Sequence, residues 1–260
     1  VDSELVNKCE NFLNKKYNSE SNCCKDFGSL NGELEFPSGE IIDQISINEN
    51  IIKIVKKMLN TDNITLIQSD AWSKYGEINV KKNSNKDQRM HMDYGNNTFL
   101  HPSSWEDPEV VSIIIYFSDT KITGGGTSVV PKQGKNDILY QPPYINMPGQ
   151  NNYPFINNKQ LSEKYFYKYH PEIYNFRKKL YDREIITSPN VGDILFYRLD
   201  TWHRGTPVNN GCIRNVMNLA WKKSECTWIN NWNRGWTKKM YYGNIEKLFV
   251  DMTPIQRATL

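Results

Sequence analysis

The sequence lacks a long apolar run and any large excess of charge of one sign. No stretch approaches the roughly 18 consecutive apolar residues that a membrane-spanning helix needs. The formal net charge is only +3 at pH 7, which is too small to indicate a polyanionic partner by itself. We therefore expect a globular protein that does not bind a membrane and whose charge gives no indication of a nucleic-acid partner. Its oligomeric state is left open.

The five cysteines form neither a CxxC pair nor a regular series. An odd number without such spacing argues against a disulfide framework and against a zinc site. A reducing compartment is the simpler interpretation, and we expect an intracellular, cytoplasmic protein. Because the chain opens on Val1 rather than Met, an N-terminal leader that has been removed stays an open alternative.

Helical and strand-like patterns follow one another without an internal repeat, which predicts one domain over residues 1–260. Apolar residues recur at helical spacing in 4–17 and 51–59, so residues 1–62 are expected to form an N-terminal helical buttress. Residues 63–221 contain short β-branched segments typical of strands, at 64–67, 110–117, 127–130, 194–197 and 213–221. Strands framed by helices predict a mainly β fold, an antiparallel sandwich or barrel with flanking helices.

Two further segments interrupt or follow this core. Residues 141–184 form an insertion whose first half is rich in Pro and Asn, and whose second half, from Ser162 to about Tyr181, is predicted to be helical. An excursion of this length is typical of a lid over a functional site. Residues 222–260 are expected to form a helical tail, in which tryptophans recur every four residues at 228, 232 and 236.

The most informative motif is His91-Met92-Asp93. Residues two apart on a strand point to the same side, so an imidazole and a carboxylate would be directed at one point. With a second histidine from a distant strand they make the set of two His and one carboxylate that binds iron on one face and leaves coordination positions open. His203, which follows an apolar strand, is the candidate.

The turn after His203 strengthens this hypothesis. Asn209-Asn210-Gly211 is typical of a tight turn. If Asn210-Gly211 is a two-residue hairpin loop, positions 203 and 218 pair, and Arg214 shares the face of His203 about 13 Å further along the strands. A dicarboxylate that chelates iron at one end needs a cation at such a distance, and the planar fork of Arg binds a carboxylate through two hydrogen bonds. A three-residue loop would put Arg214 on the opposite face.

The motif HMD, followed by WHRGTPVNNGCIR with its Arg eleven residues after the His, resembles the phytanoyl-CoA dioxygenase family of 2-oxoglutarate-dependent oxygenases. The resemblance covers roughly Ile64 to Trp221. The tail DMTPIQRATL is similar to the LTPEQR-like ending of many members. The family resemblance implies a double-stranded β-helix (a jelly roll of the cupin type). It also implies Fe(II) as cofactor and 2-oxoglutarate and O₂ as co-substrates.

The resemblance also implies roles for individual residues. His91, Asp93 and His203 would hold the iron, and Arg214 would bind the distal carboxylate of 2-oxoglutarate. Further co-substrate contacts are expected from Gln68 and Thr127, whereas Gly205 stands where some relatives have a Ser. Candidates for substrate contact, chosen for their proximity to the motif, are Trp72, Tyr94, Asn96 and Thr98.

The expected reaction is hydroxylation of a small organic substrate, with release of succinate and CO₂. Asp93 argues against the halogenase variant of this chemistry, which loses the carboxylate so that halide can bind the iron, and leaves hydroxylation or desaturation. Two alternatives are the same chemistry on a protein or nucleic acid, and a catalytically inert β-sandwich binding module. An inert module should carry no iron.

Overall fold

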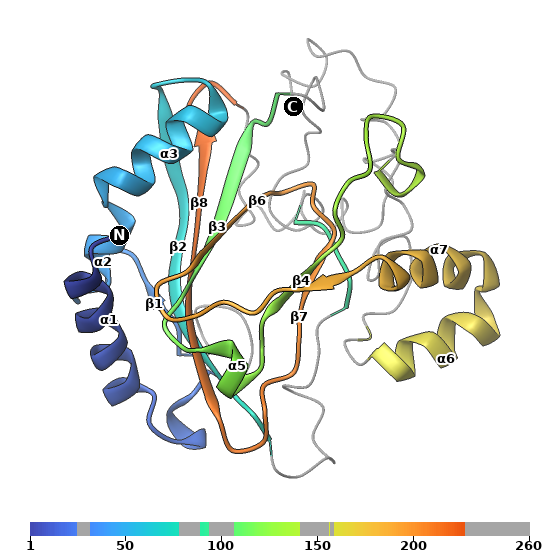
Figure 1. Ribbon diagram of the computed structural model, residues 1–260, viewed down its shortest axis with the longest axis horizontal. Helices are drawn as coiled ribbons and strands as arrows, with labels where there is room; N and C mark the ends of the chain where they lie inside the picture. The colour runs from blue at the N-terminus through green and yellow to red at the C-terminus, as the bar shows by residue number, and fades with distance from the viewer. Residues whose placement is uncertain (25–31, 78–88, 94–106, 141–155, 157–158, 227–260) are drawn as a thin grey trace, which may run out of the picture.

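Two antiparallel β-sheets lie at the centre of the molecule, with helices on either side of them (Figure 1). The computed structural model describes residues 1–24, 32–77, 89–93, 107–140, 156 and 159–226. Among these residues, one sheet has five strands in the order β1-β2-β8-β3-β6, and the other has three in the order β5-β4-β7. The strands are β1 (Leu34–Glu35), β2 (Ile64–Tyr75), β3 (Val110–Tyr116), β4 (Thr127–Val129), β5 (Ile185–Ile186), β6 (Ile194–Arg198), β7 (His203–Gly205) and β8 (Ile213–Lys223).

The helices α1 (Ser3–Lys16) and α3 (Glu49–Leu59) begin where the sequence supplies capping side chains. Asp2 accepts a hydrogen bond from the backbone N–H of Glu4 at the start of α1, and Asn48 does the same at the start of α3. α3 ends at Asn60, which adopts the left-handed conformation. The helices and 3-10 turns are α1 (Ser3–Lys16), η1 (Glu20–Asn22), α2 (Asp43–Ser46), α3 (Glu49–Leu59), α5 (Thr120–Thr123), η3 (Ile138–Tyr140), α6 (Lys159–Tyr169) and α7 (Pro171–Asp182). Within the described ranges, none of them combines the length and the apolar character that crossing a membrane requires.

The five-stranded sheet buries one face under the N-terminal helices. Ile113 and Leu219 on that face pack with Leu13 of α1 and Val55 of α3 in the main apolar core. The alternate residues of the same strands point to the opposite face. This inner face meets the three-stranded sheet, since Tyr116 of β3 is hydrogen-bonded through its hydroxyl to the Thr127 hydroxyl of β4 at 2.6 Å.

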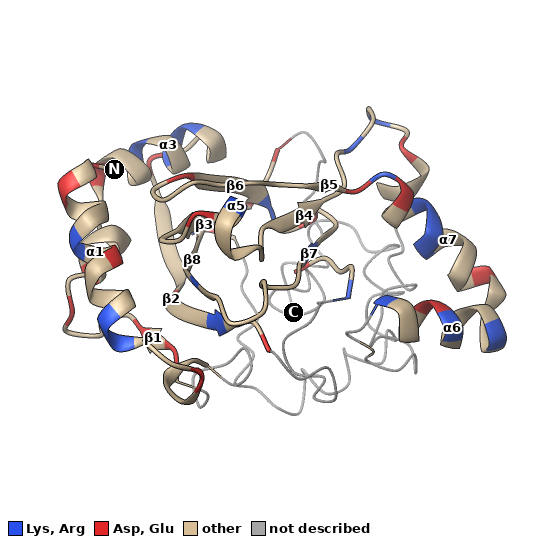
Figure 2. Ribbon diagram, turned by 60° about the horizontal axis from the view of Figure 1, so that its bottom comes forward, with Lys and Arg blue, Asp and Glu red and all other residues tan. Residues whose placement is uncertain are grey.

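A pair of helices extends from the three-stranded sheet. The segment from Ser162 to Tyr181, predicted to be helical, contains two helices, because Pro171 cannot continue α6 and instead begins α7. Phe176 of α7 packs edge-on against Trp202, with ring centroids 5.9 Å apart. Figure 2 shows basic and acidic residues mixed along α1, α3, α6 and α7, as the small net charge leads one to expect.

The prediction of a hairpin between β7 and β8 is wrong, because these two strands do not pair with each other. β7 pairs with β4, while β8 pairs with β2 and β3, so the chain changes sheet between them. The tight turn itself is present: the N–H of Cys212 donates to the Asn209 carbonyl at 3.0 Å, and Gly211 has a φ of 75°. β8 cannot pair with His203, because Val129 occupies one side of that residue and His91 the other.

Candidate metal centre

The side chains of His91, Asp93 and His203 converge between the sheets. The Nε2 atoms of His91 and His203 each lie 3.6 Å from Oδ1 of Asp93. One ligand atom from each residue lies within 4.8 Å of the others. Both histidines are buried, and the Asp93 side chain is 14% exposed. The three donors therefore surround one point that a small ion could occupy.

Backbone pairing brings the two histidines together. The N–H of His91 donates to the His203 carbonyl at 2.9 Å, and the N–H of His203 donates to the His91 carbonyl at 2.8 Å. Residues paired in this way are directly opposite, so their side chains share a face. The N–H of Asp93 in turn donates to the Leu199 carbonyl at 3.0 Å, which fixes the carboxylate beside them.

Backbone carbonyls orient both imidazole rings. Nδ1 of His91 lies 2.8 Å from the Arg89 carbonyl, and Nδ1 of His203 lies 2.9 Å from the Thr201 carbonyl. A carbonyl can only accept, so each Nδ1 carries a proton, and the Nε2 atom of each ring faces Asp93. Burial lowers the pKa of His91 well below its usual value, and the His203 ring beside it acts in the same direction. His91 is therefore neutral, as a metal ligand must be.

Tyr197 of β6 holds the carboxylate from the opposite sheet. Its hydroxyl donates to Oδ2 of Asp93 at 3.3 Å, which leaves Oδ1 directed at the two imidazoles. Burial, together with the neighbouring Asp93 charge, raises the pKa of Tyr197, so the phenol remains a donor at any physiological pH. Such outer hydrogen bonds fix the orientation of metal-binding carboxylates.

The donor set fits a divalent transition metal. Two imidazole nitrogens and one carboxylate oxygen are ligands that Fe(II) takes on one face, with the remaining positions open. Ligand atoms about 2.1 Å from an octahedral ion lie about 3 Å from their neighbours. The 3.6 Å separations from Asp93 need only a small contraction to reach that spacing.

Arg214 is a buried cation whose guanidinium has no carboxylate partner among the residues that the structure describes. It is 3% exposed, and Nη1 donates to the Gly125 carbonyl at 2.9 Å, whereas Nε and Nη2 are buried without an acceptor. The guanidinium stacks over the Trp72 ring at 4.7 Å. Burial lowers its pKa. Two unused donors on one planar fork match the two oxygens of a carboxylate.

Arg214 and the metal-binding residues face the same interior. On the five-stranded sheet, Tyr197 of β6 pairs with Ser112 of β3, and Ser112 pairs with Ala220 of β8. Cross-strand partners share a face, and so do residues separated by an even number along a strand. Arg214 therefore projects from the same face as Tyr197, the residue that contacts Asp93.

The other predicted contact residues have different surroundings. The Thr127 hydroxyl is already bonded to Tyr116, and Gln68 Nε2 donates to Oδ1 of Asp70 at 2.9 Å. Trp72 lies beside Arg214, next to the expected co-substrate position. Tyr94, Asn96 and Thr98 lie outside the described residues, as does the first half of the predicted insertion.

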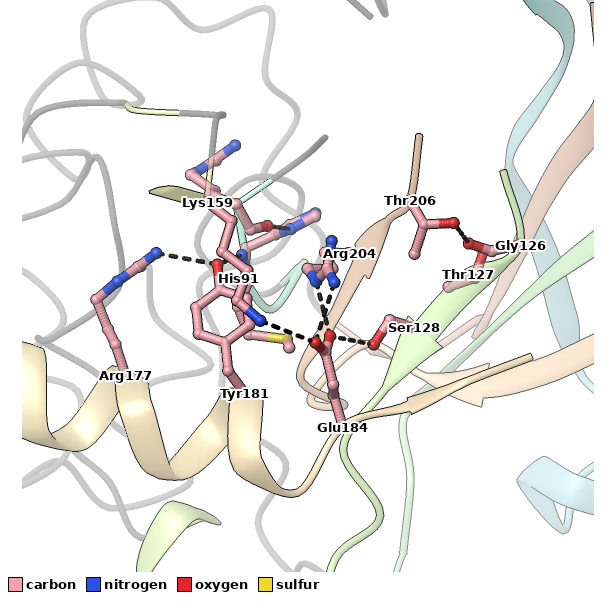
Figure 3. A network of polar contacts seen from close by, with 12 residues as sticks. His91, Gly126, Thr127, Ser128, Lys159, Arg177, Tyr181, Glu184, Arg204 and Thr206 are labelled. Carbon is pink, nitrogen blue, oxygen red and sulfur yellow. Dashed lines mark hydrogen bonds and ion pairs between the residues drawn. The ribbon is translucent and has the colours of Figure 1, made fainter. Parts of the chain in front are cut away.

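A network around Glu184 supports the strands that carry the histidines (Figure 3). Glu184 follows α7 and accepts from Nε of Arg204 at 2.7 Å and from the Ser128 hydroxyl at 2.6 Å. From α7 itself, the Tyr181 hydroxyl accepts from the N–H of Met90, next to His91, at 3.4 Å. Arg204, which alternation directs away from the metal, thus ties β7 to the helices.

Several residues of this interior have no signal in the sequence motifs. Tyr197, Tyr116, Asp70 and Asn218 lie on strands whose pairing brings them to the inner face. Side chains alternate along a strand, so the face of one residue is known only after another residue of the same strand has been assigned to a face. Arg214 could have provided that reference for Asn218, which lies four residues further along β8.

Solved structures with a similar fold include non-haem 2-oxoglutarate-dependent enzymes. The 2-oxoglutarate-dependent carbocyclase SnoK from nogalamycin biosynthesis matches with a TM-score of 0.58 and 12% identity, over 92% of this chain and 83% of that one. The epimerase SnoN, solved with Fe3+, 2-oxoglutarate (alpha ketoglutarate) and nogalamycin RO, matches with a TM-score of 0.55 and 12% identity, over 88% and 78%.

EctD from S. alaskensis, solved with 2-oxoglutarate and 5-hydroxyectoine, matches with a TM-score of 0.52 and 8% identity, over 85% of this chain and 68% of that one. No protein-family model and no curated protein sequence matches the chain. The likenesses therefore establish the fold, which is the jelly roll that the motifs predicted.

Proposed function

We propose that the protein is an Fe(II)- and 2-oxoglutarate-dependent oxygenase that hydroxylates a small organic molecule and releases succinate and CO₂. One observation carries the proposal: three metal-binding side chains and a buried guanidinium without a carboxylate partner project into the same interior. An inert binding module gains nothing from this combination, because each group costs stability when it is buried without its ligand.

Each residue has a defined task in this proposal. His91, His203 and Asp93 would hold the iron, and Tyr197 keeps the carboxylate in position. Arg214 would bind the distal carboxylate of 2-oxoglutarate through Nε and Nη2, while Gly125 fixes the guanidinium. Bound iron supplies the one-electron and O₂ chemistry that side chains lack.

The close approach of Arg214 to the loop before β4 depends on a glycine. A Cβ at Gly125 would lie 3.0 Å from Cδ of Arg214 and 2.8 Å from Cγ2 of Val208, and the residue has a φ of 75°. A larger residue would therefore displace the guanidinium. The sequence Gly124-Gly125-Gly126 is thus suited to seat the co-substrate anchor.

The choice of a small substrate and of this family rests on two further supports. The neighbours of this fold were solved with small molecules, nogalamycin RO in SnoN and 5-hydroxyectoine in EctD. The HMD and WHRGTPVNNGCIR segments carry the narrower resemblance to the phytanoyl-CoA dioxygenases. Asp93, which lies beside both histidines, argues against halogenation.

Anaerobic titration with Fe(II), then with 2-oxoglutarate, tests the proposal. We expect one iron per chain, followed by one 2-oxoglutarate whose binding requires the iron. Asp93→Ala should weaken iron binding at least 100-fold and, once O₂ is admitted, abolish succinate formation, because it removes one of three ligands. Asp182→Ala, which removes an exposed carboxylate at the end of α7, is the matched control and should bind normally. A wild-type protein that takes up no iron, or an Asp93→Ala variant with unchanged turnover, would refute the proposal.

A further inference from the structure

A polar cluster on the inner face of β2 and β8 lies apart from both the metal-binding residues and Arg214. Asp70 of β2 and Asn218 of β8 are direct cross-strand partners. Directly opposed residues in an antiparallel pair have Cβ atoms about 5 Å apart and point the same way. Gln68 stands two residues before Asp70 on the same face.

Two acceptors of this cluster have no donor within the described part of the chain. Oδ1 of Asp70 accepts from Gln68 Nε2 at 2.9 Å, but its Oδ2 is buried without a partner. Oδ1 of Asn218 is buried without a partner as well. Two unsatisfied acceptors that face each other across a strand pair repel, and each costs free energy in the interior. One group that donates to both would remove the cost.

The electrostatic surroundings favour a cation as that group. Glu35 of β1 is the cross-strand partner of Asp70, and Glu33 lies nearby. Burial raises the pKa of Asp70, and the negative charges of these two residues raise it further, to about 7. The basic residues of this face, Lys74 and Arg214, each lie four residues further along, about 13 Å of strand. Within the described chain, Oδ2 of Asp70 accepts no hydrogen bond from either of them.

The cluster lies within reach of the reaction centre. The register places Gln68, Ala220, Ser112 and Tyr197 on one line across the sheet, and Tyr197 contacts Asp93. Asp70 and Asn218 occupy the next line, towards Arg214. β2 and β6 are three strand spacings apart, about 14 Å. A molecule anchored at Asp70 could therefore present a carbon several bonds away to the metal.

We propose that Asp70 and Asn218, supported by Gln68, bind a protonated amine of the substrate. The ammonium donates to Oδ2 of Asp70 and to Oδ1 of Asn218, the two acceptors that the fold leaves unsatisfied. This inference rests on the proposed function, because it names the substrate class of that same site. It makes the protein an oxygenase for amines, with the oxidised carbon distant from the nitrogen.

Three small molecules that share a six-carbon chain but differ in the terminal group test the proposal: hexylamine, hexan-1-ol and hexanoate. Each is titrated calorimetrically, without O₂, into protein loaded with Fe(II) and 2-oxoglutarate. We expect hexylamine to bind at least ten-fold more tightly than either other probe at pH 8. Its affinity should fall between pH 8 and pH 6, because Asp70 gains a proton while the amine stays charged. Hexanoate that binds as tightly as hexylamine would overturn the proposal.

Two variants and a control test whether hexylamine binds at Asp70 and Asn218. Asp70→Asn should weaken hexylamine binding at least ten-fold and leave hexan-1-ol unaffected; Asn218→Leu should weaken it less, since it removes a neutral acceptor. Asp62→Asn, whose side chain is 99% exposed, removes the same charge at the surface and should change nothing. Unchanged 2-oxoglutarate affinity shows that each variant is folded. Equal hexylamine binding by Asp70→Asn and the wild type contradicts the assignment.

The two proposals fail in different ways. If iron and 2-oxoglutarate bind but hexylamine shows no preference that depends on Asp70, the amine site is wrong and the oxygenase proposal stands. If hexylamine binds through Asp70 to a protein that takes up no iron, the oxygenase proposal is wrong and the amine site stands.

Discussion

Tyr197 links the two sheets at the candidate metal centre. It projects from the five-stranded sheet, whereas His203, which shares the centre with Asp93, belongs to the three-stranded sheet. Its donation to Oδ2 leaves one carboxylate oxygen for the metal. The phenol therefore controls the direction of a ligand without binding the ion itself.

Replacing this phenol tests the role. Tyr197→Phe should weaken metal binding about 10- to 100-fold, the usual effect of losing such an outer hydrogen bond, with little change in the fold. Competition with a chelating dye measures the affinity. Tyr167→Phe, at a residue 69% exposed on α6, is the matched control. Equal metal affinity in Tyr197→Phe and the wild type would mean that Asp93 needs no such support.

Arg214 is a residue at which function and stability oppose each other. Arg214→Met keeps the stem but removes a buried cation without a carboxylate partner. The free energy of unfolding of the metal-free protein should stay the same or rise, because burying such a charge is costly. Binding of 2-oxoglutarate should fall at least 100-fold while iron binding persists. Chemical denaturation and calorimetry measure both, and undiminished co-substrate binding would disprove the assignment.

At the scale of elements, the contact between α7 and β7 determines where the metal-binding strands lie. Glu184 and Arg204 form a buried pair, with side chains 10% and 5% exposed. The same carboxylate receives the Ser128 hydroxyl of β4. The helices of the predicted insertion therefore support the three-stranded sheet directly, a structural role that is additional to any lid.

Removing the carboxylate should reveal this contribution. Glu184→Ala takes the acidic partner from a buried Arg204 and should lower the free energy of unfolding by about 3 kcal/mol. Asp182→Ala breaks an exposed pair with Lys178 nearby and should cost less than about 1 kcal/mol. Urea denaturation of both variants gives the comparison. Similar losses in the two would show that the buried pair is no stronger than the surface one.

Elements differ in how well local sequence predicts them. α1 and α3 have capping side chains and a helical apolar period, so their predicted limits are close to those observed. β7 is three residues long and carries no alternating pattern of its own. Its partners are His91 and the strand β4, both distant in sequence, and nothing in the turn at Asn210-Gly211 distinguishes a hairpin from a change of sheet.

At the scale of the whole molecule, stability should depend on pH through Asp70. Its pKa is about 7 in the folded protein, above the usual 3.8, so the folded state holds a proton that the unfolded state releases between about pH 4 and 7. The contribution of Asp70 to the free energy of unfolding is therefore greatest below that range, falls as pH rises through it, and is level above it. The loss amounts to up to about 4 kcal/mol.

Asp70→Asn should remove this slope. The variant should exceed the wild type in free energy of unfolding at pH 8 and match it near pH 4, because the amide carries no charge to bury. Urea denaturation across this range, taken as the difference between the two proteins, isolates Asp70 from other titrating groups. A difference that stays constant with pH would show that the carboxylate is solvated.

The sequence by itself determined the candidate donors and the general architecture. Spacing two apart places His91 and Asp93 on one side of an extended segment whatever surrounds them, and short β-branched runs between helices specify a β core. These are local properties of the backbone. Arg214 was found through its offset from His203, although the hairpin used to argue its direction does not exist.

Only the tertiary structure decided which groups meet in the interior. Asp70 and Asn218 lie 148 positions apart, and their juxtaposition follows from the register of β2 on β8. Tyr197 reaches Asp93 because two sheets face each other. Local patterns set the side to which a side chain points, but strand pairing between distant segments sets its neighbours, and the burial that leaves an acceptor or a cation without a partner exists only after the sheets have packed.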